Sequence, residues 1–196
     1  MQQTHDSKLL GDNYGYVQVD IDSKSKLLLH RTVTKCVKPT QYYNSKQISY
    51  IKGDVTSEAH MTVCYGIKNS DLHERYAKSK ISIQTDKELT IYKVDYWLGA
   101  QNEYCLIYAV PEDNSKFYKL DNWIRNNNEI YEKSLAFEPH ISLCYIRNIP
   151  IKTMESVIAK ISKSLIGKKI MSEEISFFKP ITEVKIKLKT SLDREV

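Results

Sequence analysis

The sequence predicts an α+β fold in which strands outnumber helices, and three observations support this class. Several short stretches alternate apolar and polar residues or are rich in β-branched residues, which is typical of strands. Two longer stretches repeat apolar residues at the spacing of an amphipathic helix. The strand candidates lie far apart in the chain, so most of their pairings must be non-local. Since no linker-like stretch interrupts the chain, we expect one domain over residues 1–196.

The first half of the chain contains mainly strand candidates. Residues 16–21 alternate apolar and polar side chains, and residues 48–51 form a short apolar stretch that ends before Gly53. Residues 61–67 are β-branched and aromatic, which also favours a strand. Residues 69–71 can cap a short helix that runs to Ala77.

The second half alternates between strands and helices. Residues 99–102 are suited to a hairpin turn between two strands, and Gly167 is suited to end a helix. The predicted elements are strands at 89–98 and 104–110, a helix at 115–127, a strand at 141–146, a helix at 154–165, and strands at 175–178 and 184–188.

Composition limits the classes of protein that the chain can represent. Hydrophobic residues make up 41% and charged residues 27%, which excludes a disordered chain. The longest apolar run, residues 105–110, is too short to cross a bilayer, so we expect no membrane association. The first residues contain no apolar targeting segment, so we expect a cytoplasmic location, in the host cytoplasm if the source is viral. A net charge of +5 favours an anionic partner such as a phosphate-bearing ligand.

The most informative feature is a repeated octet. Residues 58–65 read EAHMTVCY, and residues 138–145 read EPHISLCY. Four positions are identical, and three others are chemically equivalent pairs. Each octet falls on a predicted strand, so the same functional groups recur in the same local context.

Side chains alternate along a strand, so each octet should place its histidine, hydroxyl and cysteine on one face and its apolar residues and tyrosine on the core face. The first face would carry His60, Thr62, Cys64, His140, Ser142 and Cys144. The core face would carry Met61, Val63, Tyr65, Ile141, Leu143 and Tyr145. If a local two-fold relates the two strands, both histidine–hydroxyl pairs face one cleft.

Two such pairs suit phosphoester chemistry. One neutral imidazole can take a proton from the attacking oxygen while the other, protonated, gives a proton to the leaving oxygen. The hydroxyls of Thr62 and Ser142 can donate to the non-bridging phosphate oxygens. We therefore predict that His60 and His140 are the catalytic acid and base, in an order that the sequence leaves open, and that no cofactor is needed.

A zinc site is the alternative for the same residues, since His60, Cys64, His140 and Cys144 are all zinc-ligand types. On a strand, however, positions four apart are separated by roughly 13 Å. Two ligands of one zinc each lie about 2.0–2.3 Å from the metal, so they cannot be that far apart. The β-branched and aromatic residues of the octets favour strands over helices, and we therefore expect no metal.

The two H-x-[ST] strands, in a chain of this length, resemble those of the two-histidine (2H) phosphoesterase superfamily. Its members include LigT-like RNA cyclic phosphodiesterases, viral 2′-5′ oligoadenylate phosphodiesterases and phage anti-CBASS nucleases that destroy cyclic-nucleotide signals. The resemblance implies a bilobal, pseudo-two-fold fold with antiparallel sheets lining a central cleft and helices outside. It also implies a metal-independent phosphodiesterase, with His60 and His140 matching the catalytic histidines and Thr62 and Ser142 matching the phosphate-binding hydroxyls.

Within that superfamily, the expected substrate is a cyclic or short oligonucleotide. Aromatic faces can stack on bases, and Tyr14, Tyr16 and Trp97 are the candidate base-binding residues. A composition rich in Lys, Ile, Asn and Tyr favours a phage anti-CBASS nuclease among these enzymes. No obligate protein partner is inferred. A different class of function also stays open, in which the same cleft binds and sequesters a nucleotide or RNA end without cleaving it.

Overall fold

The computed structural model describes residues 15–46, 52–68, 88–99, 102–112, 115–128, 130, 138–178 and 183–187. Its elements follow one another as β1 (Gly15–Ile21), α1 (Ser23–Cys36), the 3-10 turns Pro39–Gln41 and Thr56–Glu58, β2 (His60–Ile67), β3 (Glu88–Leu98), β4 (Tyr104–Pro111), α3 (Ser115–Asn127), β5 (Ile141–Arg147), α4 (Ile151–Leu165), β6 (Lys169–Phe178) and β7 (Glu183–Lys187). The two candidate elements at 48–51 and 69–77 lie outside these described residues.

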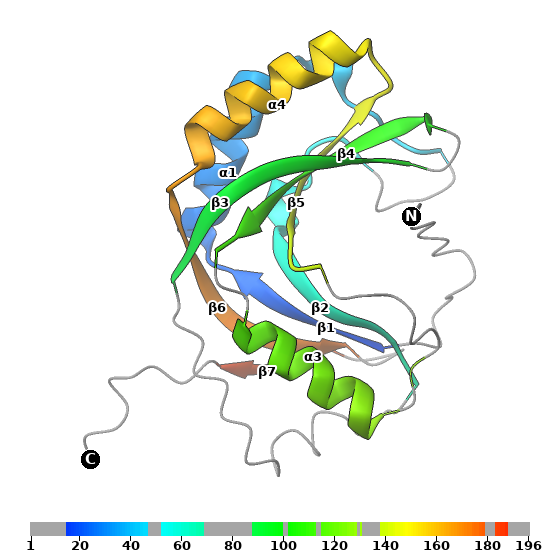
Figure 1. Cartoon of the computed structure of the whole chain (residues 1–196), viewed down its shortest axis with the longest axis vertical. Helices are drawn as coiled ribbons and strands as arrows, with labels where there is room; N and C mark the ends of the chain where they lie inside the picture. The colour runs from blue at the N-terminus through cyan, green and yellow to red at the C-terminus, as the bar shows by residue number, and fades with distance from the viewer. Residues whose placement is uncertain are drawn as a thin grey trace.

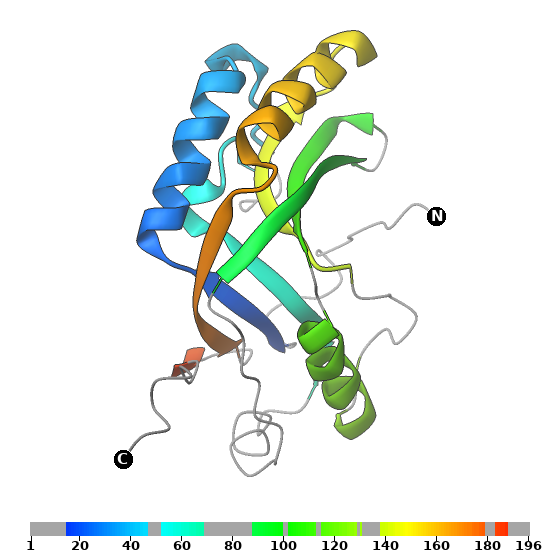
Figure 2. The same ribbon diagram turned by 60° about the vertical axis from the view of Figure 1, so that its left-hand side comes forward.

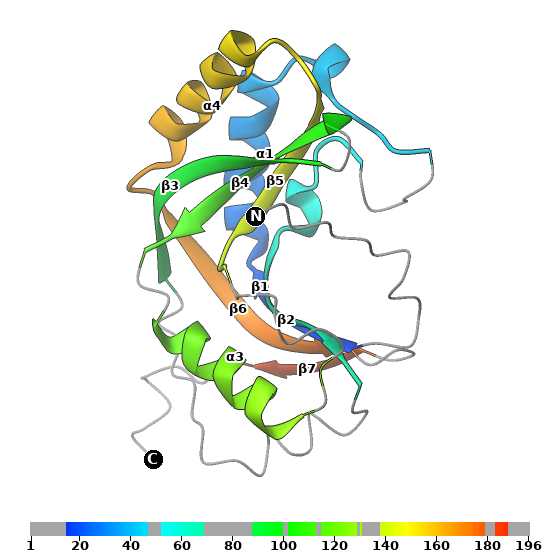
Figure 3. The same cartoon turned by 45° about the vertical axis from the view of Figure 1, so that its right-hand side comes forward.

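The strands pair antiparallel throughout, in the order β1-β2-β5-β4-β3-β6-β7, and β6 also pairs with β1. The first part of β6 pairs with β3, and the rest of it pairs with β1. Strand β6 therefore joins two halves of the sheet, one built from β3, β4 and β5 and the other from β1, β2, β6 and β7 (Figures 1 and 3). The α+β class and the antiparallel sheet that the sequence predicts are confirmed.

The chain order contains a repeated unit of strand, helix and strand. One copy is β1–α1–β2 and the other is β4–α3–β5. Each helix contacts a strand of the opposite copy: α3 packs against β2, and α1 contacts β5. Helices α1 and α4 lie side by side on one end of the molecule, and α3 lies at the other end (Figures 1 and 2).

The two octet strands each contain a β-bulge at the same position. In β2, the partners of Val17 and Gln18 are Cys64 and Thr62, which leaves Val63 as the extra residue. In β5, Ile107 and Tyr108 pair with Cys144 and Ser142, which leaves Leu143 as the extra residue. A bulge shifts the alternation of side chains by one residue, so every position after it changes face.

These bulges contradict part of the predicted alternation. Cys64 and Cys144 were expected beside the histidines, but they are buried in the hydrophobic core, with exposed fractions of 2% and 0%. Tyr65 was expected in the core, but it is 37% exposed, and Tyr145 is half-buried. The prediction was wrong for these four residues because strict alternation takes no account of an inserted residue.

Helix α1 is absent from the predicted elements, although its signals are present in the sequence. The Asp22 carboxylate accepts a hydrogen bond from the Ser25 backbone N–H at 2.7 Å, which caps the helix. Leu29, Thr32 and Val33 are buried, which is the i, i+3, i+4 pattern of an amphipathic helix. This helix matters for the rest of the fold because it packs against α4 and the turn that precedes β2.

Other boundaries agree with the sequence or extend it. Gly167 ends α4 with a φ of 77°, as expected for a glycine at a helix C-terminus. The β3–β4 hairpin is closed by a hydrogen bond from Gly99 N–H to the Tyr104 carbonyl at 2.9 Å. Strand β6 begins at Lys169, well before the predicted strand at 175–178. None of the helices in the described part of the chain has the length and apolar character needed to span a membrane.

Replacing Leu29 by Ala should lower the free energy of unfolding by about 2–5 kcal/mol, because its side chain is fully buried under α1. Leu27 lies on the same helix but is 46% exposed, so Leu27→Ala is the matched control and should change stability by less than about 0.5 kcal/mol. Urea denaturation of the two variants measures both values. Equal losses in the two variants would contradict the orientation of α1.

Candidate functional site

The two octet histidines lie next to the point where β2 and β5 pair. Met61 and Ile141 are partners across these antiparallel strands, and both side chains are fully buried. The residues next to them therefore point to the opposite face, and extending the antiparallel register by one residue on each side of this pair would put Thr62 across from His140 and His60 across from Ser142. In a regular antiparallel ladder, the diagonal relation of His60 and His140 corresponds to a separation of roughly 7–8 Å. All four side chains are half-buried.

The two imidazoles are held in the same way. His60 Nδ1 lies 2.8 Å from the Glu58 carbonyl oxygen, and His140 Nδ1 lies 2.7 Å from the Glu138 carbonyl oxygen. A carbonyl oxygen can only accept, so Nδ1 carries the hydrogen in both rings. In its neutral form each imidazole then has its lone pair on Nε2, which can accept a proton. In the protonated ring the same nitrogen can donate one.

The surroundings of the two rings differ. Asp20 is the strand partner of His60, and its carboxylate accepts hydrogen bonds from the Gln18 amide at 2.5 Å and from the Ser176 hydroxyl. Burial lowers the pKa of His60 below its usual value, while the Glu58 carbonyl and the Asp20 charge act in the opposite direction. His60 is therefore a ring whose neutral form is favoured, next to a carboxylate that is already held by two neutral donors.

His140 instead packs against aromatic rings. The ring centroids of Trp97 and Tyr108 lie 4.4 Å and 5.4 Å from that of His140, both in edge-to-face arrangements. The ring centroids of Trp97 and Tyr108 also lie 4.3 Å from one another. Together these rings fix the orientation of His140 in the half of the site built from β3, β4 and β5.

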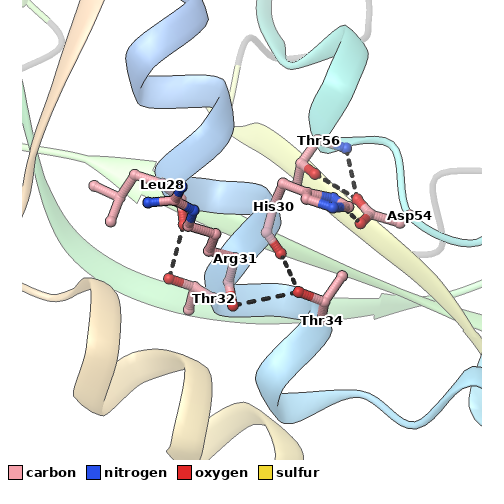
Figure 4. A network of polar contacts seen from close by, with 7 residues as sticks. All are labelled: Leu28, His30, Arg31, Thr32, Thr34, Asp54 and Thr56. Carbon is pink, nitrogen blue, oxygen red and sulfur yellow. Dashed lines mark hydrogen bonds and ion pairs between the residues drawn. The ribbon is translucent and has the colours of Figure 1, made fainter.

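The turn that precedes His60 is anchored to α1, as Figure 4 shows, and also to β5. His30 Nδ1 lies 2.7 Å from one oxygen of Asp54, and the other oxygen accepts from the Thr56 N–H at 2.9 Å and from the Thr56 hydroxyl at 2.5 Å. Val55, between Asp54 and Thr56, donates its N–H to the Leu143 carbonyl at 3.2 Å. These contacts position the turn whose last residue, Glu58, supplies the carbonyl that holds His60. His30 is not among the site residues predicted from the sequence, because it lies outside any motif.

The predicted base-binding aromatic residues lie in different places. Tyr14 is outside the described residues. Tyr16 lies between two other rings, with centroids 4.3 Å from Phe178 and 5.8 Å from Tyr65. Trp97 packs on His140, as described above. Base binding by Tyr16 and Trp97 stays a prediction.

The cysteines of the octets are unsuited to join the histidines as ligands. Burial raises the pKa of the Cys64 thiol to about 12 and also raises that of Cys144, so both stay protonated. Both also lie in the core, behind the face that carries His60 and His140. In the part of the chain that the structure describes, no group of three or more His, Cys, Asp or Glu side chains is placed to hold a metal ion.

Comparisons with known proteins give fold similarity only. No family model matches the chain, and no curated protein matches its sequence. Among solved structures, Usb1 of Kluyveromyces marxianus has a TM-score of 0.56 with 9% identity, over 91% of this chain and 100% of Usb1. The complex of the same Usb1 with uridine monophosphate has a TM-score of 0.54 with 9% identity and the same coverage. LigT of E. coli complexed with ATP has a TM-score of 0.50 with 14% identity, over 90% of this chain and 95% of LigT. The chain thus has an α+β antiparallel fold that matches structures of the 2H phosphoesterase superfamily.

We expect the imidazole of His60 to titrate below its usual pKa of 6.5, because burial penalises its charged form. The unfolded chain then binds this proton first as the pH falls, so the free energy of unfolding should decrease from about pH 6.5 down to the folded-state pKa. NMR titration of the ring protons gives the pKa, and urea denaturation at several pH values gives the stability. In His60→Asn this part of the pH dependence should disappear. A His60 pKa above 6.5 would show that the Asp20 carboxylate outweighs burial.

Proposed function

We propose that this protein is a metal-independent phosphodiesterase that cleaves cyclic or short oligonucleotides by paired-histidine acid–base catalysis. The observation that carries the proposal is the equivalence of the two octets in space. Both histidines donate Nδ1–H to the carbonyl two residues earlier, and both strands bulge directly after the hydroxyl residue. Two copies of one local geometry, joined at the Met61–Ile141 pair, support a shared site in which both Nε2 atoms reach the same phosphate.

The proposed reaction uses four side chains. The scissile phosphate lies between the imidazoles, and its non-bridging oxygens accept hydrogen bonds from Thr62 and Ser142. One neutral histidine takes the proton of the attacking hydroxyl, from water or from a neighbouring ribose, as the new P–O bond forms. The other histidine, protonated at Nε2, gives its proton to the leaving oxygen as the old P–O bond breaks. The two imidazoles end with exchanged protonation states, and proton exchange with water restores them.

Nucleotide substrates are supported by two further observations. Usb1 of similar fold was solved with uridine monophosphate, and LigT of similar fold was solved with ATP. The face that carries the histidines is also rich in aromatic side chains, including Tyr65, Trp97 and Tyr145, which suit base stacking. Composition is what favours a cyclic-nucleotide immune signal within this class.

Replacing either His60 or His140 by Ala should lower the turnover number by about 10²-fold or more, since each loss removes one proton-transfer group. The wild type should keep its activity in the presence of a chelator. Turnover is measured on a panel of cyclic dinucleotides and trinucleotides, linear oligoadenylates and RNA ends with 2′,3′-cyclic phosphate. Circular dichroism of both variants controls for folding.

Two results would contradict this assignment. The first is undiminished turnover in both histidine variants. The second is recovery of intact ligand after long incubation with the wild type, at concentrations where binding is saturated. That result would indicate the sequestering module rather than an enzyme.

The ratio kcat/KM should pass through a maximum as pH rises, because one histidine must be neutral and the other protonated. The two limbs should fall between about pH 5 and pH 8, where imidazoles titrate. Initial rates at low substrate concentration measure this profile. A rate that is constant over this range, with chemistry verified as the slow step by single-turnover kinetics, would exclude paired acid–base roles.

A further inference from the structure

The two octet tyrosines lie on the same face as the histidines. The bulges at Val63 and Leu143 turn Tyr65 and Tyr145 out of the core, as their exposure shows. Without the bulges, the alternation of the strand would bury both rings. The structure thus repeats a third group, a tyrosine, beside each histidine–hydroxyl pair.

Each tyrosine is supported by a row of rings from neighbouring strands. In one half, Tyr65 stacks on Tyr16 at 5.8 Å with an interplanar angle of 26°, and Tyr16 stacks on Phe178 at 4.3 Å and 8°. In the other half, Tyr145 and Tyr104 pack edge to face with ring centroids 5.4 Å apart, and Tyr104 stacks on Tyr43 with centroids 5.3 Å apart. Rings held in this way lose little further freedom when a flat ligand stacks on them.

The tyrosines lie on opposite sides of the histidines. Tyr65 and Tyr145 each follow the Met61–Ile141 pair by four residues, of which the bulge takes up one, so each lies about 10 Å along its strand from that pair. Because β2 and β5 are antiparallel, they run away from the pair in opposite directions. By this count the Cα atoms of Tyr65 and Tyr145 are about 20 Å apart along the strand direction, with those of His60 and His140 between them.

We propose that Tyr65 and Tyr145 are two base-stacking subsites, one on each side of the scissile phosphate, so that the substrate carries a nucleoside on both sides of the bond that is cut. This inference rests on the phosphodiesterase proposed above. A base is joined to phosphorus through a ribose by roughly five or six covalent bonds of about 1.5 Å each, so it can reach at most about 9 Å outward, toward a tyrosine about 10 Å along the strand. A dinucleoside phosphate, linear or within a small ring, fits this spacing. A phosphate ester with a base on one side only fills one subsite.

The test compares three substrates of adenosine: the dinucleoside monophosphate ApA, the 5′-(p-nitrophenyl phosphate) and the 3′-(p-nitrophenyl phosphate). Tyr65→Leu and Tyr145→Leu should each raise the KM for ApA by about tenfold, since stacking on an aromatic ring is lost. With the two p-nitrophenyl esters, which carry one base each, Tyr65→Leu should raise the KM of one positional isomer and Tyr145→Leu should raise that of the other. Tyr65→Phe and Tyr145→Phe keep the ring and should restore the KM. Tyr118→Leu is the matched control, because Tyr118 is exposed on α3.

The results separate this inference from the proposed function. Cleavage of ApA with a KM that is unchanged in both leucine variants would overturn the two subsites and leave the phosphodiesterase intact. If the wild type cleaves none of the three, equilibrium binding of ApA to the same variants decides the question. Tenfold weaker binding in both leucine variants supports the subsites, and unchanged binding overturns them. Thermal unfolding of every variant verifies that the fold is kept.

Discussion

The candidate site depends on the antiparallel contact between β2 and β5 at Met61 and Ile141. These two strands come from the two halves of the sheet, and the pairing of β2 with β5 is made by the Cα partners Met61 and Ile141. Both side chains are fully buried, so the core fixes their direction, and the histidines that precede them must face the other way. Burial of two apolar side chains on one face thus determines which polar groups meet on the opposite face.

The local geometry around each histidine is determined by backbone groups. A carbonyl two residues earlier orients each ring, and the turn that carries the Glu58 carbonyl is tied to α1 through His30 and Asp54. The halves then differ in what surrounds the ring, because Asp20 lies beside His60 whereas Trp97 and Tyr108 pack on His140. The two rings therefore share a tautomer but not an electrostatic environment, since a carboxylate lies beside His60 and aromatic rings pack on His140.

Much of this could be predicted from the sequence, because alternation and repetition are local properties. The octets predicted two strands with His60 and Thr62 on one face and His140 and Ser142 on the equivalent face, and the structure has that arrangement. Local pattern also found the β3–β4 hairpin and the end of α4 at Gly167. The prediction of a common face for both pairs required only that the strands be related by a local two-fold.

The remaining features depend on partners that are distant in the chain. The bulges are shifts of register between the octet strands and their partners β1 and β4. The exposure of Tyr65 and the burial of Cys64 therefore could not be predicted from the sequence of β2 alone. Strand β6 begins early because Lys169 to Met171 pair with β3, although this part has little apolar pattern. Helix α1 was missed for a different reason, since its buried Leu29 lies in a run of three leucines that hides the helical spacing.

The most direct test of the central claim is whether one phosphate contacts both imidazoles. A dinucleoside with a phosphorothioate linkage, which is cleaved slowly, can be titrated into the protein while the Nε2 resonances of His60 and His140 are followed by ¹⁵N NMR. If both imidazoles contact one phosphate, the two resonances should shift together with one dissociation constant and a stoichiometry of one. A shift confined to one ring, or two shifts with different dissociation constants, would contradict a shared site.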